Sequence, residues 1–400
     1  MNNISIALLV GAVSMLTSTT VFPMALKFAR KHGIVDCPDA RKLQRAPVPV
    51  FGGIVVYSGI LTGGLVLLML LPNTTLMWGL VVMTGMMGIG IWDDIKDISA
   101  SLRFLVETLL VTGFISVTGV YIDDLHGLWG IHELAPEVGV SLSIFAGVGI
   151  INAINLIDGV DGYSSGYGIL ACLCFAIAFW AAWSTVMMCI SLVVIGALLP
   201  FFFHNVFGVR SRMFIGDGGT LMLGTLMVVM VFCSMSSHGK MAQMEHYGFC
   251  IPAFLVAVGC IPILDTIRVM TMRILRGGSP FKPDKTHLHH LFIDMGFSHL
   301  GAALFILLVN AMVVATWFLS WKAGASLDVQ MYIVLALGLL VTFGFYKLMK
   351  VQQASGRKGG RLWRVMRRLG RWTHRENKHS WEVIKDFMDG PMMGGGKDGG

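Results

Sequence analysis

Side chains that could bind a metal ion through oxygen fall into three short groups in this 400-residue chain. They are Asp93, Asp94 and Asp97; Asn152, Asn155, Asp158 and Asp161; and Asp217 in the run Gly216–Thr220. Each group borders an apolar run, where a carboxylate is costly unless it is hydrated, paired or bound to a cation. Each group alone is also compatible with helix capping and a solvated turn. Together they indicate a divalent cation, and oxygen ligands favour Mg²⁺ or Mn²⁺ over zinc.

Positive and imidazole side chains form a fourth group further along the chain. Its members are Arg268, Arg273, Arg276, His287, His289 and His290. Guanidinium groups bind phosphate oxygens through paired hydrogen bonds. The histidines could bind zinc, but no cysteine accompanies them, so we favour hydrogen bonding to phosphate or sugar. Carboxylates, a divalent cation and phosphate-binding cations together indicate phosphoryl transfer.

The composition shows that these groups belong to a membrane protein. Hydrophobic residues make up 55% of the chain and charged residues only 13%, against about 25% charged residues in soluble proteins. A spanning helix needs about 20 apolar residues. Eleven runs have or approach this length: 4–26, 51–71, 76–92, 102–118, 140–157, 166–183, 186–203, 220–236, 248–264, 300–320 and 330–349. The sequence therefore predicts an all-α integral membrane protein, a polytopic bundle of about eleven transmembrane helices.

The distribution of Lys and Arg predicts the orientation of that bundle. With the N-terminus outside, only Lys240 and Lys322 of the 30 Lys and Arg residues fall in outer segments. Positively charged loops resist translocation. We therefore expect the C-terminus and all the acidic groups described above on the cytoplasmic side.

The chain divides into a membrane domain, residues 1–349, and a basic cytoplasmic tail, residues 350–400. Within the tail, Leu362, Trp363, Met366, Leu369 and Trp372 recur at near-helical spacing among five arginines. This pattern fits an amphipathic helix on anionic lipid. It fits equally well if the arginines serve only to fix the membrane topology. The glycine-rich end, 390–396, is expected to be disordered. Because the tail is tethered at the membrane, nucleic acid is a poor candidate partner.

Four motifs in this order resemble those of the polyprenyl-phosphate N-acetylhexosamine-1-phosphate transferases, glycosyltransferase family 4. The motifs are Asp93-Asp94-x-x-Asp97, the run from Asn152 to Gly162, Gly216-Asp217-x-Gly-Thr, and Pro280-Phe281 with Asp284 and His287-x-His289-His290. The resemblance extends over about residues 1–350. The His-x-His-His form is more similar to the WecA-type branch, which uses UDP-N-acetylglucosamine, than to the MraY-type branch, which uses UDP-MurNAc-pentapeptide. Thr220 replaces the usual Ser and keeps its hydroxyl group.

The resemblance implies a multi-pass enzyme of the bacterial cytoplasmic (inner) membrane with Mg²⁺ as cofactor, or Mn²⁺ in its place. The phosphate of undecaprenyl phosphate would attack the β-phosphorus of a UDP-N-acetylhexosamine. UMP would leave, and the lipid-linked sugar diphosphate would initiate cell-envelope polysaccharide synthesis. The expected partners are these two substrates and the lipid bilayer; a homodimer is one option for the oligomeric state.

Residue roles follow from matching the motifs position by position. The expected Mg²⁺ ligands are Asp217 and Asp94. The expected catalytic residues are Asp93, Asp94, Asp158, Asp161, Arg273 and His287, with Asp93 as candidate base; the expected substrate-binding residues are Asn152, Asn155, Asp97, His289 and His290. Asp97 could equally be structural. Glu107 and Asp265, in or beside spans, are either supporting partners or interfacial residues.

Two alternatives stay open at the level of sequence. One is the same phosphotransfer with UDP-MurNAc-pentapeptide or another UDP-N-acetylhexosamine as donor. The other is a secondary transporter, which would require carboxylates near the bilayer midplane and usually an inverted repeat. No repeat is visible in the sequence, and the acidic groups lie at the ends of apolar runs.

Overall fold

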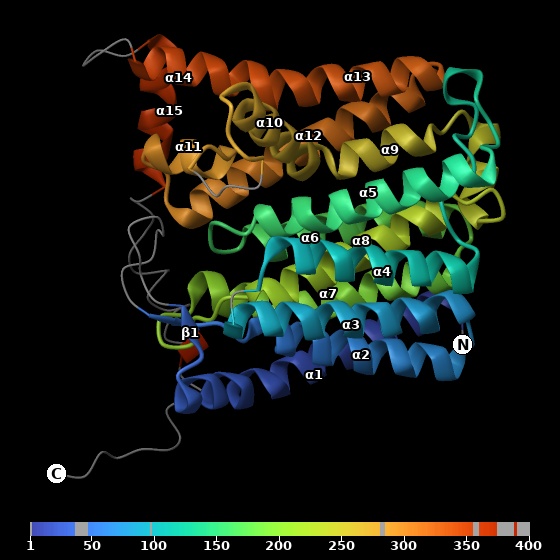
Figure 1. The fold of residues 1–400 in the computed structure, drawn as a ribbon, viewed down its shortest axis with the longest axis horizontal. Coiled ribbons are helices and arrows are strands. Elements are labelled where there is room, and N and C mark those ends of the chain that lie inside the picture. Colours follow the sequence, from blue (N-terminus) through green and yellow to red (C-terminus); the bar gives the residue numbers. More distant parts are fainter. Residues whose placement is uncertain are drawn as a thin grey trace.

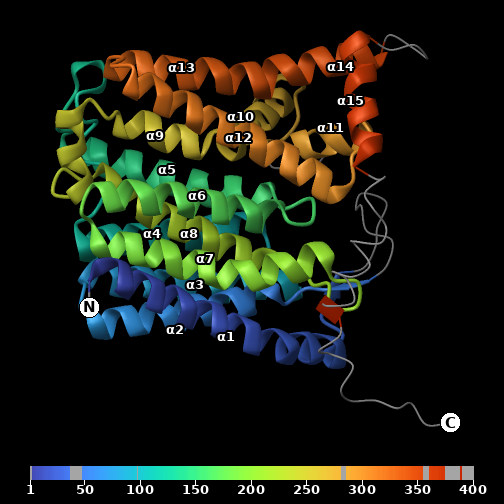
Figure 2. The ribbon, with the colours of Figure 1, turned by 180° about the vertical axis from the view of Figure 1, so that it is seen from behind.

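The computed structural model describes residues 2–36, 47–96, 98–280, 285–354, 360–373 and 388–389. Long helices run side by side, and their connections gather at the two ends of the bundle (Figure 1, Figure 2). The long helices are α1 (Asn3–His32), α2 (Gly52–Leu70), α3 (Thr74–Lys96), α4 (Ala100–Thr118), α5 (Pro136–Leu156), α6 (Tyr163–Ala181), α7 (Thr185–Phe207), α8 (Gly216–Met235) and α12 (His299–Lys322).

Shorter elements complete the chain. They are the strands β1 (Val35–Asp36) and β2 (Val48–Pro49), the helices α9 (Ile251–Val258), α10 (Cys260–Leu275), α11 (Leu288–Asp294), α13 (Leu327–Leu339), α14 (Tyr346–Ala354) and α15 (Arg361–Trp372), the 3-10 helices η1 (Leu128–Gly130) and η2 (Lys240–Tyr247), and the π-helix η3 (Leu340–Phe345). The segment α13–η3–α14 is one apolar helix of 28 residues.

The number of membrane-spanning helices agrees with the sequence prediction. Within the described residues, ten helices are long and apolar enough to span a bilayer, and the bent pair α9–α10 makes eleven if it counts as one span. The described N-terminus and α15 lie at opposite ends of the bundle (Figure 1). The predicted polytopic all-α architecture is therefore confirmed, with a sheet of two two-residue strands added to it.

The ninth span differs from its prediction because it is broken. Helices α9 and α10 meet at Gly259 with a bend of 72°. Asn310 of α12 satisfies the interrupted backbone: its Nδ2 donates to the carbonyl oxygen of Val258 at 3.0 Å, and its Oδ1 accepts from the Ile261 amide at 3.0 Å. A break at membrane depth requires such a partner, since lipid offers no hydrogen bonds.

Helix α8 occupies the centre of the bundle, and most of its residues are buried. Glycines allow its N-terminal turn to approach two neighbouring helices closely. A Cβ atom added at Gly90 of α3 would lie 2.3 Å from the Gly218 Cα atom, and one at Gly53 of α2 would lie 2.6 Å from the Gly219 nitrogen. The backbones of α2 and α3 therefore fix the position of the turn that contains Asp217.

A small β-structure fixes the same turn from the end of the bundle. Strands β1 and β2 pair antiparallel, Val35 with Pro49. The chain after β2 then bonds to the segment before α8, since the Gly52 amide donates to the Phe214 carbonyl at 2.8 Å. Residues 33–36 and Val50, at the two sides of this sheet, thus form one wall of the space in front of α8.

Candidate active site

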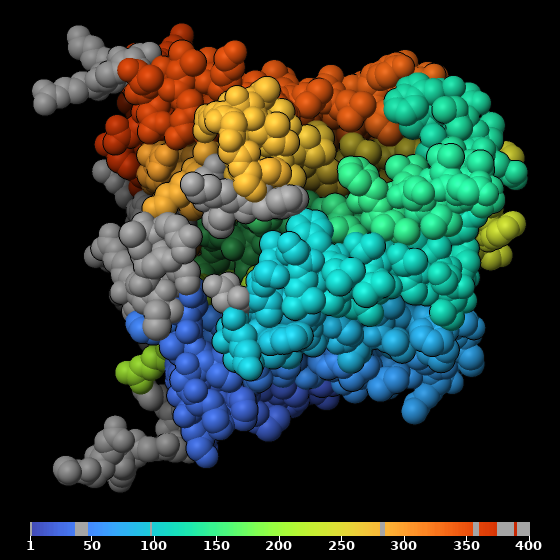
Figure 3. All heavy atoms as spheres, viewed as in Figure 1, coloured from blue at the N-terminus to red at the C-terminus, as the bar shows by residue number. Residues whose placement is uncertain are grey.

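The three acidic groups meet at one cavity, at the end of the bundle where β1 and α11 lie. Its volume is about 730 Å³. The polar lining residues are His32, Asp36, Asp94, Asn155, Asp158, Asp161, Ser164, Asn205, Asp217, His290 and His299. Figure 3 shows a hollow toward this end of the molecule, beside blue and cyan segments, with green atoms at its floor. Groups that are far apart in sequence therefore share one space.

Five other predicted site residues are buried away from the lining of this cavity. They are Asp93, Asn152, Arg273, His287 and His289; all five are buried, and none of them lines the cavity. Asp97 lies outside the described residues. The structure thus separates the predicted residues into a set that faces the cavity and a buried set that does not.

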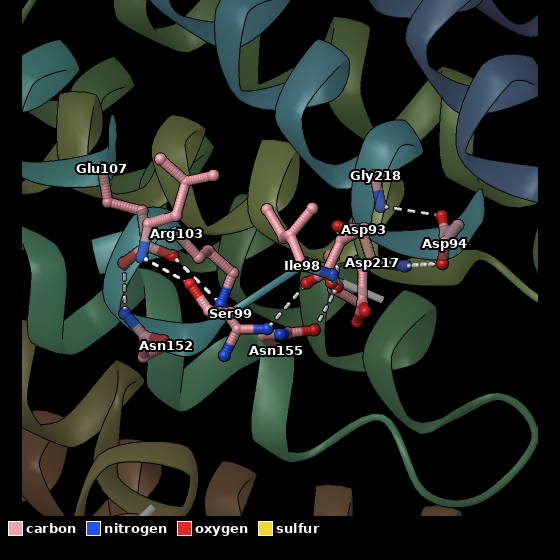
Figure 4. A network of polar contacts seen from close by, with 12 residues as sticks. Asp93, Asp94, Ile98, Ser99, Arg103, Glu107, Asn152, Asn155, Asp217 and Gly218 are labelled. Atoms are coloured by element: carbon pink, nitrogen blue, oxygen red, sulfur yellow. Dashed lines mark hydrogen bonds and ion pairs between the residues drawn. The ribbon is translucent and has the colours of Figure 1, made fainter. Parts of the chain in front are cut away.

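Asp94 connects α3 to the start of α8. Its Oδ1 accepts a hydrogen bond from the Asp217 amide at 2.8 Å, and its Oδ2 accepts one from the Gly218 amide at 3.2 Å (Figure 4). The first amides of a helix have no partner within the helix and attract negative charge. The carboxylate of Asp94 therefore lies directly beside Asp217.

Asp158 projects into the cavity from the loop between α5 and α6. The Ser164 hydroxyl donates to its Oδ1 at 2.7 Å. The surrounding protein limits hydration of the carboxylate and, together with the negative charges of Asp217 and Asp161, raises the pKa of Asp158 to about 7. The negative charge of Asp217 thus repels the carboxylates of both Asp158 and Asp94.

Asp161 differs from these three because the cation Arg212 and the imidazole of His299 contact its carboxylate. Arg212 donates to its Oδ2, and Nδ1 of His299 lies 3.0 Å from the same oxygen. Burial alone would raise the pKa of Asp161, but the contacts with His299 and Arg212 outweigh it and lower the pKa. Asp161 therefore joins the α5–α6 loop to α12 and to the segment before α8.

Asp93 points away from the cavity, although it neighbours Asp94 in sequence. Arg103 of α4 donates from Nη1 to its Oδ2 at 3.0 Å, and the Ile98 amide donates to its Oδ1 at 3.0 Å. Nε of Arg103 lies 3.6 Å from Oε1 of Glu107, whose side chain is fully buried (Figure 4). Asp93 thus fixes the turn between α3 and α4 in this structure; its proposed role as a base stays a prediction.

The two predicted asparagines also occupy different positions. The side chain of Asn152 donates from Nδ2 to Glu107 Oε2 and to the Val148 carbonyl. Asn155 lines the cavity, and its Oδ1 accepts from the Thr220 hydroxyl of α8 at 2.6 Å. Thr220 thus uses its hydroxyl to orient Asn155.

A buried ion-pair network supports the histidine motif. Asp265 of α10 accepts from Nδ1 of His287 at 2.9 Å and from the Leu288 amide at 3.1 Å, while Arg268 donates to its other oxygen at 2.6 Å. Arg268 is 1% exposed and stacks on the Tyr346 ring. Because a carboxylate only accepts, Nδ1 of His287 is the protonated nitrogen in this pair. Asp265 is therefore a supporting partner, one of the two roles expected for it.

The remaining histidines lie between that network and the cavity. The His289 ring is parallel to that of His287 at a centroid distance of 5.7 Å and packs against Gly159. Burial, with the neighbouring His290 and His287, lowers the pKa of His289, which favours the neutral ring. His290 itself lines the cavity. The histidine motif thus contacts the Asp158 loop from behind and contributes one side chain to the site.

We expect Asp265→Ala to destabilise the protein by about 3–5 kcal/mol, because it leaves the buried Arg268 guanidinium without its carboxylate. Thermal unfolding of the purified protein measures the effect. Asp294→Ala is the matched control, since Asp294 forms an exposed pair with Lys350 that is worth at most about 1 kcal/mol. Equal midpoints for the two variants would contradict the structural role of Asp265.

The donor set of the cavity fits a hard cation shared with a ligand. Among the described residues, no three His, Cys, Asp or Glu side chains are grouped closely enough to hold a metal ion alone. Mg²⁺ commonly takes one or two carboxylates and completes its shell with water and substrate phosphate. Asp94 and Asp217 supply such oxygens, and the charge of Asp217 acts on both Asp94 and Asp158. A cation between them would relieve this repulsion.

The sequence interpretation missed the residues that neutralise or orient the acidic groups. These are Arg103, Ser164, Arg212 and His299. Arg212 lies five residues before Asp217, so its place beside a predicted motif could have suggested a role. His299 gives no such signal, because it begins an apolar helix far from the acidic motifs in sequence.

Comparison with known proteins finds relatives in the family that the motifs resemble. A model of glycosyl transferase family 4 matches residues 76–235. The chain is 28% identical over 363 residues to the undecaprenyl-phosphate alpha-N-acetylglucosaminyl 1-phosphate transferase of Escherichia coli (strain K12), covering 90% of this chain and 93% of that protein. It is 32% identical over 301 residues to the "Probable undecaprenyl-phosphate N-acetylglucosaminyl 1-phosphate transferase" of Bacillus subtilis (strain 168), covering 74% and 80%.

Proposed function

Because this chain belongs to glycosyl transferase family 4, we propose that it transfers N-acetylglucosamine 1-phosphate from UDP-N-acetylglucosamine to undecaprenyl phosphate. The names of the relatives contain this acceptor and this sugar phosphate. The reaction releases UMP and leaves a lipid-linked sugar diphosphate. The observation that carries the proposal is the cavity at which Asp94, Asp158 and Asp217 meet, at the end of an apolar helical bundle.

A cavity at the end of the bundle can receive one substrate from the bilayer and one from water. The lipid acceptor approaches within the bilayer, whereas the nucleotide sugar arrives from water. The two cations predicted outside, Lys240 and Lys322, belong to η2 and the end of α12, away from the cavity. Since positive residues favour the cytoplasmic side, we assign the cavity end to the cytoplasm and the protein to the bacterial inner membrane.

The side chains around the cavity have distinct tasks in this reaction. Asp94 and Asp217 would hold Mg²⁺, or Mn²⁺, which when bound supplies positive charge to the diphosphate. Asn155, oriented by Thr220, and His290 are positioned to donate hydrogen bonds to the nucleotide sugar. Arg212 and His299 keep Asp161, and with it the Asp158 loop, in place. Catalysis then depends on positioning and charge stabilisation.

Removal of the metal tests the proposed cation site. We expect excess EDTA to abolish turnover and added Mg²⁺ to restore it, because Asp94, Asp158 and Asp217 would otherwise repel a diphosphate. Turnover is followed as UMP release by the purified protein. Full activity after exhaustive chelation would contradict the assigned metal.

Product analysis with a panel of donors tests the function itself. The reconstituted protein is incubated with UDP-N-acetylglucosamine, UDP-N-acetylgalactosamine or UDP-MurNAc-pentapeptide, with and without undecaprenyl phosphate. We expect UMP release only when the lipid is present, and fastest with UDP-N-acetylglucosamine. A preference for another donor would revise the substrate, whereas donor uptake into vesicles without UMP release would favour a transporter.

A further inference from the structure

Helix α15 presents three separate stripes, and the catalytic site uses none of them. Trp363, Met366 and Gly370 form a buried stripe against the rest of the protein. Leu362, Val365, Leu369 and Trp372 form an exposed apolar stripe, with exposed fractions of 36%, 48%, 44% and 67%. The five arginines, Arg361, Arg364, Arg367, Arg368 and Arg371, occupy the remaining surface and are exposed. In the part of the chain that the structure describes, none of them pairs with a carboxylate.

The helix lies across the end of the bundle. In Figure 1 and Figure 2 the spanning helices run horizontally and α15 runs vertically, at the end where α11 and β1 lie. A helix perpendicular to the spans lies parallel to the membrane plane. Its place beside α14 at the edge of the bundle puts it where the membrane surface surrounds the protein.

Both ends of α15 are attached to the helical bundle. At its start, the Trp363 amide donates to Oε1 of Gln352 in α14 at 2.9 Å. Just after its end, the Thr373 hydroxyl accepts from the Ser298 amide at 3.0 Å, before α12. Between these points, a Cβ atom at Gly370 would meet the Met295 carbonyl oxygen at 2.8 Å, so the helix lies close against this loop. The exposed stripes therefore have a fixed direction relative to the spans.

We propose that α15 is a membrane-surface helix that binds anionic phospholipid headgroups. Its apolar stripe enters the boundary between headgroups and acyl chains, and its arginines bind the lipid phosphates. Four exposed apolar side chains in one stripe are costly in water, which argues against a purely solvated face. An unbroken set of cations without acidic residues favours a negatively charged surface over a neutral one.

The test uses the full-length protein in nanodiscs of phosphatidylcholine, with or without phosphatidylglycerol, whose acyl chains carry bromine as a fluorescence quencher. The difference in emission between the wild type and Trp372→Phe isolates the signal of Trp372. We expect this signal to be quenched in discs with the anionic lipid and much less in discs without it.

Two charge variants separate electrostatic binding from apolar contact. The triple variant Arg364→Glu, Arg368→Glu and Arg371→Glu should lose the quenching of Trp372, whereas the same three positions changed to Lys should keep it. An unquenched Trp372 in anionic discs would show that α15 faces water. Equal quenching in both lipid compositions, or in all three proteins, would show that anionic headgroups are not recognised. Either result overturns the proposal.

Discussion

Asp217→Asn is expected to lower kcat by at least about 10²-fold while leaving the folded structure intact. The substitution keeps the side-chain volume and removes the charge that Asp94 and Asp158 experience in the cavity. A weaker cation site should also shift the Mg²⁺ dependence to higher concentration. UMP release measured over a Mg²⁺ titration reports both effects.

Glu133→Gln provides the matched control for this charge removal. Glu133 is exposed and lies in the connection between α4 and α5, away from the cavity. The control should keep the wild-type rate and Mg²⁺ dependence, and both variants should unfold at the wild-type temperature. Wild-type turnover in Asp217→Asn would remove Asp217 from the proposed metal site.

Gly90→Ala is expected to have the largest effect among substitutions outside the cavity. The new Cβ atom would lie 2.3 Å from the Gly218 Cα atom, and a backbone atom in a central helix cannot move aside as a flexible side chain can. Helices α3 and α8 must separate, which costs about 1–3 kcal/mol. Because Asp94 and Asp217 lie on these two helices, a shift of about 1 Å should lower kcat/KM by about 10²-fold.

Gly88→Ala on the same helix is the control for this prediction. A Cβ atom there meets nothing within 4 Å, so stability and turnover should match those of the wild type. Thermal unfolding and UMP release are measured for both variants. Equal behaviour of Gly90→Ala and Gly88→Ala would mean that the close approach of α3 to α8 does not set the geometry of the site.

The spans could be predicted from the sequence because each requires only its own apolar length. The break at Gly259 could not, since it depends on Asn310, which lies about 50 residues further along the chain and supplies the hydrogen bonds that the broken helix loses. The sheet of β1 and β2 was missed for a similar reason. Two-residue strands have no periodic pattern, and their stability comes from the contact with the segment before α8.

The convergence of the acidic groups could be predicted because topology alone puts their segments at one end of the bundle. The direction of each side chain could not. Asp93 and Asp94 are adjacent, yet neighbouring residues on a helix point about 100° apart, so one contacts Arg103 and the other contacts the start of α8. The partners of Asp161 come from two other segments, and only the packing of the whole bundle brings them together.

The most direct test follows the β-phosphorus of the donor. UDP-N-acetylglucosamine labelled with ³²P at this position is incubated with the reconstituted protein, undecaprenyl phosphate and Mg²⁺. The label in the lipid fraction and the nucleotide product are then measured. Phosphotransfer at the cavity of Asp94, Asp158 and Asp217 predicts that the label enters the lipid in an amount equal to the UMP released. Asp217→Asn should lower both amounts by at least about 10²-fold. Label that stays in the aqueous phase, or release of UDP in place of UMP, would contradict phosphotransfer at this cavity.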